Sequence, residues 1–235
     1  MSQPNQLNSE VKRTLVLDAS NPDLFVGILT EGSTWLATHA ESGMPLETLF
    51  PAVEHLLDSQ NCELETIDSF IYCEGPGSTL GLRLAAIAFE TWRRVLPTPP
   101  QSFAYNSLQL LAACLKQDQP HLKNALIVAD WKKDAWNAVK IEAGVLHPTS
   151  VIETSALENW REPLFHLPQR KGWQAPPPNA TTLSYQPDRL PEIIALSQIL
   201  QSVDVFESFT SAETEFKKWV PERHRAPQPK ASKNG

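Results

Sequence analysis

The chain has 235 residues, of which 41% are hydrophobic and 20% charged, and this length suits one large domain or two small lobes around a buried core. Its formal net charge of −7 argues against a domain that grips nucleic acid by itself, and no apolar run is long enough to span a bilayer. The three cysteines (Cys62, Cys73 and Cys114) have no paired spacing, which favours reduced thiols and a cytoplasmic protein without membrane association.

Hydrophobic patterning predicts an α/β chain whose first half opens with strands. The polar residues 1–11 are interpreted as a flexible tail. Patterns typical of strands follow at 14–17, 24–30, 34–38 and 67–73. Patterns typical of helices occur at 45–60, where Pro51 predicts a kink or a late start, and at 106–116. The first three strands are joined by short turns, so we expect a three-stranded meander.

Residues 71–94 (IYCEGPGSTLGLRLAAIAFETWRR) predict the end of a strand, a glycine-rich corner and a helix. Gly75, Gly77 and Gly81 permit positive φ and close backbone approach, and Ser78 or the residue after it can cap the helix. The corner has two interpretations, a phosphate-binding loop at a helix N-terminus or a tight strand-to-helix joint. It lacks the Lys-Ser/Thr pair of a Walker A loop and the spacing of a dinucleotide fingerprint, so we favour the joint.

The second half of the chain repeats this opening. Strand patterns occur at 125–129 and 135–141. The spacing from Asp130 to Gly144 equals the spacing from Asp18 to Gly32, and each pair frames a turn and a returning strand. The repeat predicts two lobes of the same topology.

The domain boundaries follow from this repeat. The first lobe is predicted at 12–118 and a smaller, partly irregular second lobe at 119–222, followed by a basic flexible tail at 223–235. Within the second lobe, residues 147–178 are rich in proline and predict irregular structure with a short helix at 155–160, and residues 190–203 predict a longer helix.

The chemistry-bearing residues give few candidates. Asp18 and Asp130 each end a strand, where they can hold a magnesium ion near a nucleotide or simply start a turn. With Gly75, Gly77 and Gly81 they are the only candidate ligand-binding residues. The six histidines have no metal-binding spacing and no serine lies in a nucleophile elbow, so we predict no catalytic residue, metal site or cofactor.

Several segments resemble the TsaB (YeaZ) family. The segment GPGSTLGLR, residues 75–83, resembles the family signature GPGSFTGLR. Further similar segments are LVLDAS at 15–20, LETLFPAVEHLL at 46–57, SLQLLA at 107–112 and IVADWKKDAW at 127–136. The chain departs from the family pattern at Thr79 and Leu80, at Ala85, and at Trp131 and Lys132 after Asp130.

The resemblance implies a duplicated ribonuclease H-like fold of the actin and sugar-kinase superfamily. It also implies a non-catalytic subunit in tRNA threonylcarbamoyladenosine synthesis, which pairs with a TsaD-like catalytic subunit, joins a TsaE-like ATPase and meets tRNA only indirectly. The pairing is expected to use the first two helices, and a homodimer of the isolated chain is expected to use the same surface. The expected interface residues are Leu46, Leu49, Phe50, Val53, Leu82, Arg83, Ala86 and Phe89.

Two other functions remain as alternatives. The first is an ATP-dependent phosphotransferase of the same superfamily, with Asp18 and Asp130 placed around ATP and magnesium. The second is a protease, which the absence of HxxxH, HExxH or a plausible triad disfavours.

Overall fold

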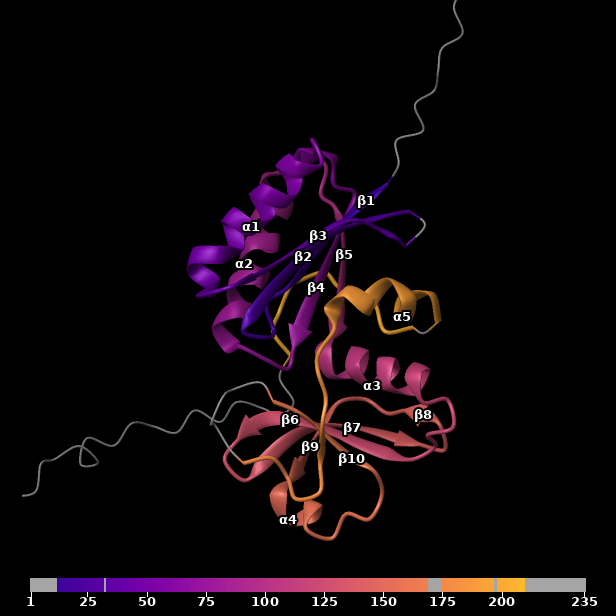
Figure 1. Cartoon of the computed structure of the whole chain (residues 1–235). Coiled ribbons are helices and arrows are strands. Elements are labelled where there is room, and N and C mark those ends of the chain that lie inside the picture. Colours follow the sequence, from indigo (N-terminus) through magenta and orange to yellow (C-terminus); the bar gives the residue numbers. More distant parts are fainter. Residues whose placement is uncertain (1–11, 32, 169–174, 197, 210–235) are drawn as a thin grey trace, which may run out of the picture.

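The computed structural model describes residues 12–31, 33–168, 175–196 and 198–209. They form two lobes, each built on a mixed sheet, with helix α3 (Ser107–Asp118) packed between the sheets (Figure 1). The two predicted lobes are therefore confirmed. Gly32 and the tails predicted at 1–11 and 223–235 lie outside the described residues.

The first lobe contains a sheet in the order β12-β5-β4-β1-β2-β3. Its strands are β1 (Arg13–Asp18), β2 (Asp23–Thr30), β3 (Trp35–Ser42), β4 (Ser69–Gly75), β5 (Gln101–Asn106) and β12 (Gln201–Ser202). Strands β1 to β3 form the predicted antiparallel meander, and β4 and β5 continue the sheet parallel to β1. Strand β5 was not predicted.

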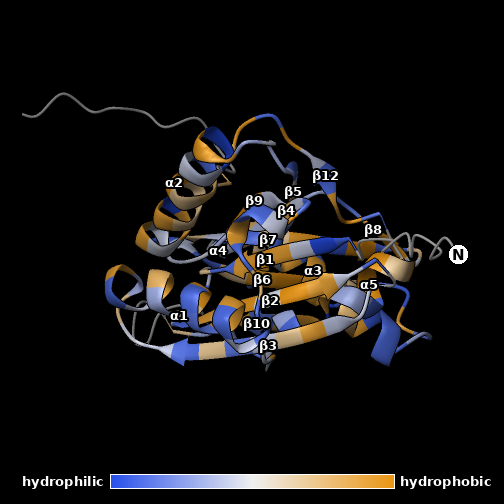
Figure 2. Ribbon diagram, turned by 90° about the horizontal axis from the view of Figure 1, so that it is seen from above, coloured by the Kyte–Doolittle hydropathy of each residue, from blue (hydrophilic) through white to orange (hydrophobic). Residues whose placement is uncertain are grey.

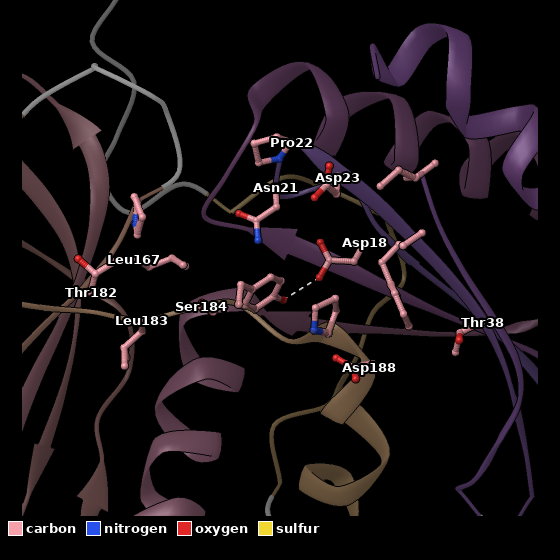
Figure 3. Close-up of a pocket in the computed structure, with 16 residues that line it drawn as sticks. Asp18, Asn21, Pro22, Asp23, Thr38, Leu167, Thr182, Leu183, Ser184 and Asp188 are labelled. Atoms are coloured by element: carbon pink, nitrogen blue, oxygen red, sulfur yellow. Dashed lines mark hydrogen bonds between the residues drawn. The ribbon is translucent and has the colours of Figure 1, made fainter. Parts of the chain in front are cut away.

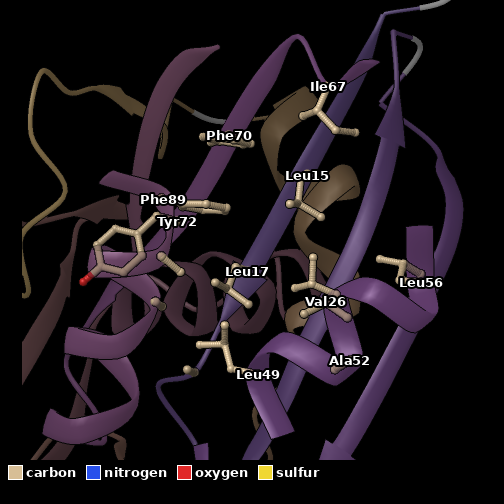
Figure 4. Packing of buried hydrophobic residues seen from close by; sticks show 14 of the residues in the cluster. Leu15, Leu17, Val26, Leu49, Ala52, Leu56, Ile67, Phe70, Tyr72 and Phe89 are labelled. Atoms are coloured by element: carbon tan, nitrogen blue, oxygen red, sulfur yellow. The ribbon is translucent and has the colours of Figure 1, made fainter. Parts of the chain in front are cut away.

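Helices α1 (Pro45–Ser59) and α2 (Thr79–Val95) cover one face of this sheet (Figure 2). Pro51 lies inside α1, as predicted. The core beneath the two helices is close-packed: Leu49 of α1 faces the sheet, and the ring of Phe89 stacks on that of Phe70 at 4.4 Å (Figure 4). Burial of such side chains supplies most of the stability of the lobe.

The second lobe repeats the topology of the first. Its strands are β6 (Ala125–Lys132), β7 (Ala135–Glu142), β8 (Val145–Leu146), β9 (Ser150–Glu153), β10 (Leu164–Leu167) and β11 (Thr181–Thr182). The β6–β7 hairpin corresponds to β1–β2, and β10 and β11 extend it in parallel as β4 and β5 extend β1. The predicted duplication is confirmed, although β9 and β10 lie in the stretch 147–178 that was expected to be irregular. Helix α4 (Thr154–Leu157) is a single turn.

The last described segment returns to the first lobe. After the 3₁₀ turn Pro187–Arg189, helix α5 (Leu190–Leu196) packs on α3, and β12 then pairs with β5. Phe206 belongs to the core beneath α2. The predicted helix over 190–203 was therefore too long. The predicted second lobe, 119–222, includes the described residues 190–196 and 198–209, which pack on the first lobe, and residues 210–222 lie outside the described part.

Candidate functional site

The glycine corner is held against the turn that follows β1. A Cβ atom at Gly77 would lie 2.2 Å from the carbonyl oxygen of Ser20, and one at Gly81 would lie 2.3 Å from that of Ala19. The backbone N–H of Ser78 donates to the same Ser20 carbonyl at 2.7 Å, and the Ser78 side chain caps α2 by accepting from the N–H of Gly81. Close backbone approach thus accounts for Gly77 and Gly81, as expected for a tight strand-to-helix joint.

A cavity of about 610 Å³ lies between the two lobes beside Asp18 (Figure 3). The turn after β1 and strands β2 and β3 form one wall, and the ends of β10 and β11 with the residues that follow them form the other. The lining residues are Asp18, Asn21, Pro22, Asp23, Leu24, Phe25, Thr38, Ala40, Leu167, Pro168, Thr182, Leu183, Ser184, Tyr185, Pro187 and Asp188.

The carboxylate of Asp18 is already engaged by the protein. Its Oδ2 accepts hydrogen bonds from the hydroxyls of Tyr105 at 2.5 Å and Tyr185 at 2.6 Å, and its Oδ1 accepts from the N–H of Ser20 at 2.9 Å. Burial, followed by the charge of Asp18, raises the pKa of both phenols well above the ordinary value, so both remain hydrogen-bond donors. Neither tyrosine was predicted, because Tyr185 is 167 positions from Asp18 and no motif links them.

The structure does not bring Asp130 to this cavity. Asp130 is buried on the face of the second sheet that looks away from α3, whereas Asp18 lies on the α3 side of the first sheet. The Oδ1 of Asp130 lies 3.6 Å from Nε2 of the buried His166, whose ring packs edge-on against Trp136. The two aspartates predicted as a pair are therefore parts of separate arrangements.

The cavity is poorly suited to a nucleotide. Among its described lining residues are three carboxylates (Asp18, Asp23 and Asp188) and no lysine or arginine, so a phosphate would meet like charge. No group of three or more His, Cys, Asp or Glu side chains in the described part of the chain has a metal-binding arrangement. The residues present do not fit the magnesium–nucleotide complex that the alternative phosphotransferase would need.

The predicted partner-interface residues divide into two groups. The buried group packs inside the first lobe and comprises Leu49, Val53, Leu82, Ala86 and Phe89. The exposed group comprises Leu46, Phe50 and Arg83. The assignment of the buried group to a partner surface is corrected, since these apolar side chains stabilise the lobe itself.

The exposed side of α1 and α2 is nevertheless apolar. Leu46 and Phe50 of α1 are 64% and 49% exposed, and Leu80 and Ile87 of α2 are 50% and 61% exposed. With the exposed Arg83 we call these five residues the outer helix face. Figure 2 shows the two helices side by side, with their outer sides directed away from the sheet. Leu80 and Ile87 were not among the predicted interface residues, and they lie on the same side of α2 as the polar Arg83.

Comparisons with known proteins identify the fold. YeaZ from Pseudomonas aeruginosa is similar in structure over 66% of this chain and 75% of that one, with 23% identity and a TM-score of 0.51. An uncharacterised protein with similarity to peptidase YeaZ from Pseudomonas aeruginosa is similar over 78% of this chain and 90% of that one, with 21% identity and a TM-score of 0.55. The chain has the YeaZ fold. No model of a known protein family and no curated protein matches the sequence.

The two mixed sheets and the likeness to YeaZ agree with the predicted fold class, a duplicated α/β fold in two lobes. The resemblance noted around the glycine corner is thus confirmed at the level of the fold. The described helices include none that is long and apolar enough to cross a membrane.

Proposed function

We propose that the chain is a non-catalytic, TsaB-like subunit of a cytoplasmic assembly that makes threonylcarbamoyladenosine in tRNA. It binds a TsaD-like catalytic subunit through the outer helix face, and a TsaE-like ATPase joins the same assembly. The observation that carries this proposal is the exposure of Leu46, Phe50, Leu80 and Ile87 on two adjacent helices whose inner sides already fill the core.

Physical chemistry supports a partner at this face. Large apolar side chains grouped on a surface favour burial against another protein, and a stable interface covers roughly 800 Å² per partner. Arg83, which lies between Leu80 and Ile87 along α2, supplies an exposed polar group that can orient a partner. When no catalytic subunit is present, a second copy of the chain uses the same face to form a homodimer.

The non-catalytic part of the proposal rests on the interlobe cavity. Three hydrogen bonds from the protein itself engage Asp18, and Asp130 lies on another face. The net charge of −7 likewise favours contact with tRNA only through the partner. Magnesium-dependent ATP turnover by the pure protein, abolished by Asp18→Asn, would contradict this and support a phosphotransferase.

Two charge insertions test the interface. Leu46→Asp and Ile87→Asp should leave thermal unfolding nearly unchanged, because both side chains are exposed, yet weaken association by roughly 2–4 kcal/mol. The measurement is co-purification from the native cells, with mass spectrometry of the bound proteins and light scattering of the isolated chain. Val145→Asp is the matched control, since Val145 is 60% exposed on β8 of the other lobe. Retained assembly in both helix variants, or equal loss in the control, would place the interface elsewhere.

A further inference from the structure

A shallow groove of about 430 Å³ opens at the C-terminal end of α1. Its floor is apolar and includes Phe50, Leu57 and Leu64, together with Trp92 of α2. The rings of Phe50 and Trp92 meet edge to face with their centroids 6.0 Å apart. Because these side chains are arranged around an open space, the groove can accept an aromatic or aliphatic side chain from another segment.

The rim of the groove is strongly acidic. Glu54, Asp58, Glu63 and Glu65 line it, and all four are exposed. None of them forms an ion pair with a described residue. The arginines that follow Trp92 in α2 both pair with Glu90, so they do not neutralise the rim. An apolar floor with an uncompensated acidic rim is complementary to a segment that is both aromatic and basic.

The chain carries such a segment near its C-terminus. Residues 216–225 read FKKWVPERHR, which combines Phe216, Trp219 and Val220 with four lysines and arginines and one acid. We propose that residues 216–225 dock in the acidic groove of the same molecule, with an aromatic side chain on the floor and the basic side chains at the rim. This inference does not rest on the proposed function, because it concerns the isolated chain.

The position at which the described chain ends makes the docking geometrically feasible. Phe206 packs against Phe89, and the N–H of Phe209 donates to the carbonyl of Glu74 at 2.7 Å, beside the corner that leads into α2. The groove lies toward the other end of α2, about 20 Å along the axis at 1.5 Å per residue. The extended chain from Phe209 to Trp219 spans up to about 33 Å.

Docking would also affect the outer helix face. Phe50 belongs to both the groove floor and that face, so a docked segment would cover part of the surface proposed for the partner. The segment would then compete with the partner rather than add to its binding.

Zero-length carbodiimide cross-linking of the full chain, read by mass spectrometry, tests the proposal. We expect links from Lys217 or Lys218 to the rim carboxylates, and their loss at high salt, which screens exposed charges. The double variant Glu54→Gln/Asp58→Asn should weaken the links that remain at the rim. The matched control Glu47→Gln, which alters an exposed acid in the first turn of the same helix, should not. Reversing the pair with Asp58→Lys and Lys218→Glu should restore a link between these two positions.

Three outcomes would overturn the proposal. Links spread evenly over acidic residues elsewhere on the surface would mean that the segment does not dock. Links between isotopically light and heavy molecules in a mixture would place the segment on a second copy. Binding of tRNA that depends on Lys217 and Lys218, without links to the rim, would assign the segment to RNA.

Discussion

The two lobes share a topology but differ in what covers their sheets. In the first lobe, α1 and α2 contain 15 and 17 residues and cover a whole face. In the second lobe the position of α1 is taken by the four residues of α4, and the described residues between β10 and β11 form no helix. Both sheets still pack on α3. The comparison shows that the same sheet can be covered on its outer face by two long helices in one lobe and, among the described residues, by one helical turn and irregular chain in the other.

The two hairpins differ by one residue in register, and this separates the two aspartates. In the β1–β2 hairpin, Asp18 pairs with Phe25, seven residues later in the chain. The residue seven positions after Asp130 is Asn137, but Asp130 pairs with Trp136, which is one residue earlier. Side chains alternate between the faces of a strand, so the same letter at the same spacing can lie on opposite faces of related sheets. Asp18 faces α3 and the interlobe cavity, and Asp130 faces away from them.

The largest expected effect distinguishes the inner from the outer side of α2. Phe89→Ala should destabilise the chain by about 3–5 kcal/mol, because it leaves a cavity beneath Phe70 in the first-lobe core. Ile87→Ala on the same helix, at a side chain 61% exposed, should change stability by less than about 0.5 kcal/mol. Chemical denaturation of both variants measures the difference. Similar losses in the two would mean that the outer helix face is buried.

A smaller loss of stability is expected when one glycine in each lobe is replaced by alanine. Gly77→Ala should cost about 3 kcal/mol, because the new Cβ would lie 2.2 Å from a backbone oxygen and two backbone segments must separate. Gly144→Ala in the β7–β8 turn should cost only about 1 kcal/mol, for its positive φ of 78°, since the nearest atom would be 3.6 Å away on a lysine side chain. The midpoints of urea unfolding rank the two variants. A lower midpoint for Gly144→Ala than for Gly77→Ala would show that the glycine corner accommodates a Cβ atom better than the β7–β8 turn does.

Much of the fold could be predicted because its elements have clear periodicity. The β1–β2 and β6–β7 hairpins and α1 to α3 all lie within a few residues of the prediction. Strand β5 was missed because the prolines before it dominated the local pattern, and β10 because four residues in a proline-rich stretch carry little periodicity. The helix at 190–203 was overextended, because pairing of β12 with β5 is a tertiary contact that overrides local preference.

The candidate site was less accessible from the sequence. Motifs identified the glycine corner and Asp18, but the bonds from Tyr105 and Tyr185 depend on how the two halves meet. Likewise, Phe89 was expected at the partner surface and Ile87 was not, because the rotation of the helix against the sheet decides which residues face the core. Register and rotation are set by the whole core, and neither is encoded in a short segment.

Ionisation of the buried tyrosines is expected to have the smallest effect on stability at neutral pH. Its pH dependence tests whether the two lobes separate before they unfold. Tyr72, Tyr105 and Tyr185 are the three tyrosines of the chain, and burial is the main cause that raises the pKa of each. In the unfolded chain a tyrosine loses its proton near pH 10, whereas in the folded chain it retains the proton. Above that pH the folded state therefore binds more protons than the unfolded state, and the free energy of unfolding decreases as the pH rises further. The rise in phenolate absorbance should therefore coincide with the loss of circular dichroism.

Tyr185 follows β11, and its hydrogen bond to Asp18 joins that segment to the first lobe. If one tyrosine ionised before unfolding and Tyr185→Phe removed that step, the lobes would part before either unfolds, and the cavity at Asp18 would be open to ligands after all.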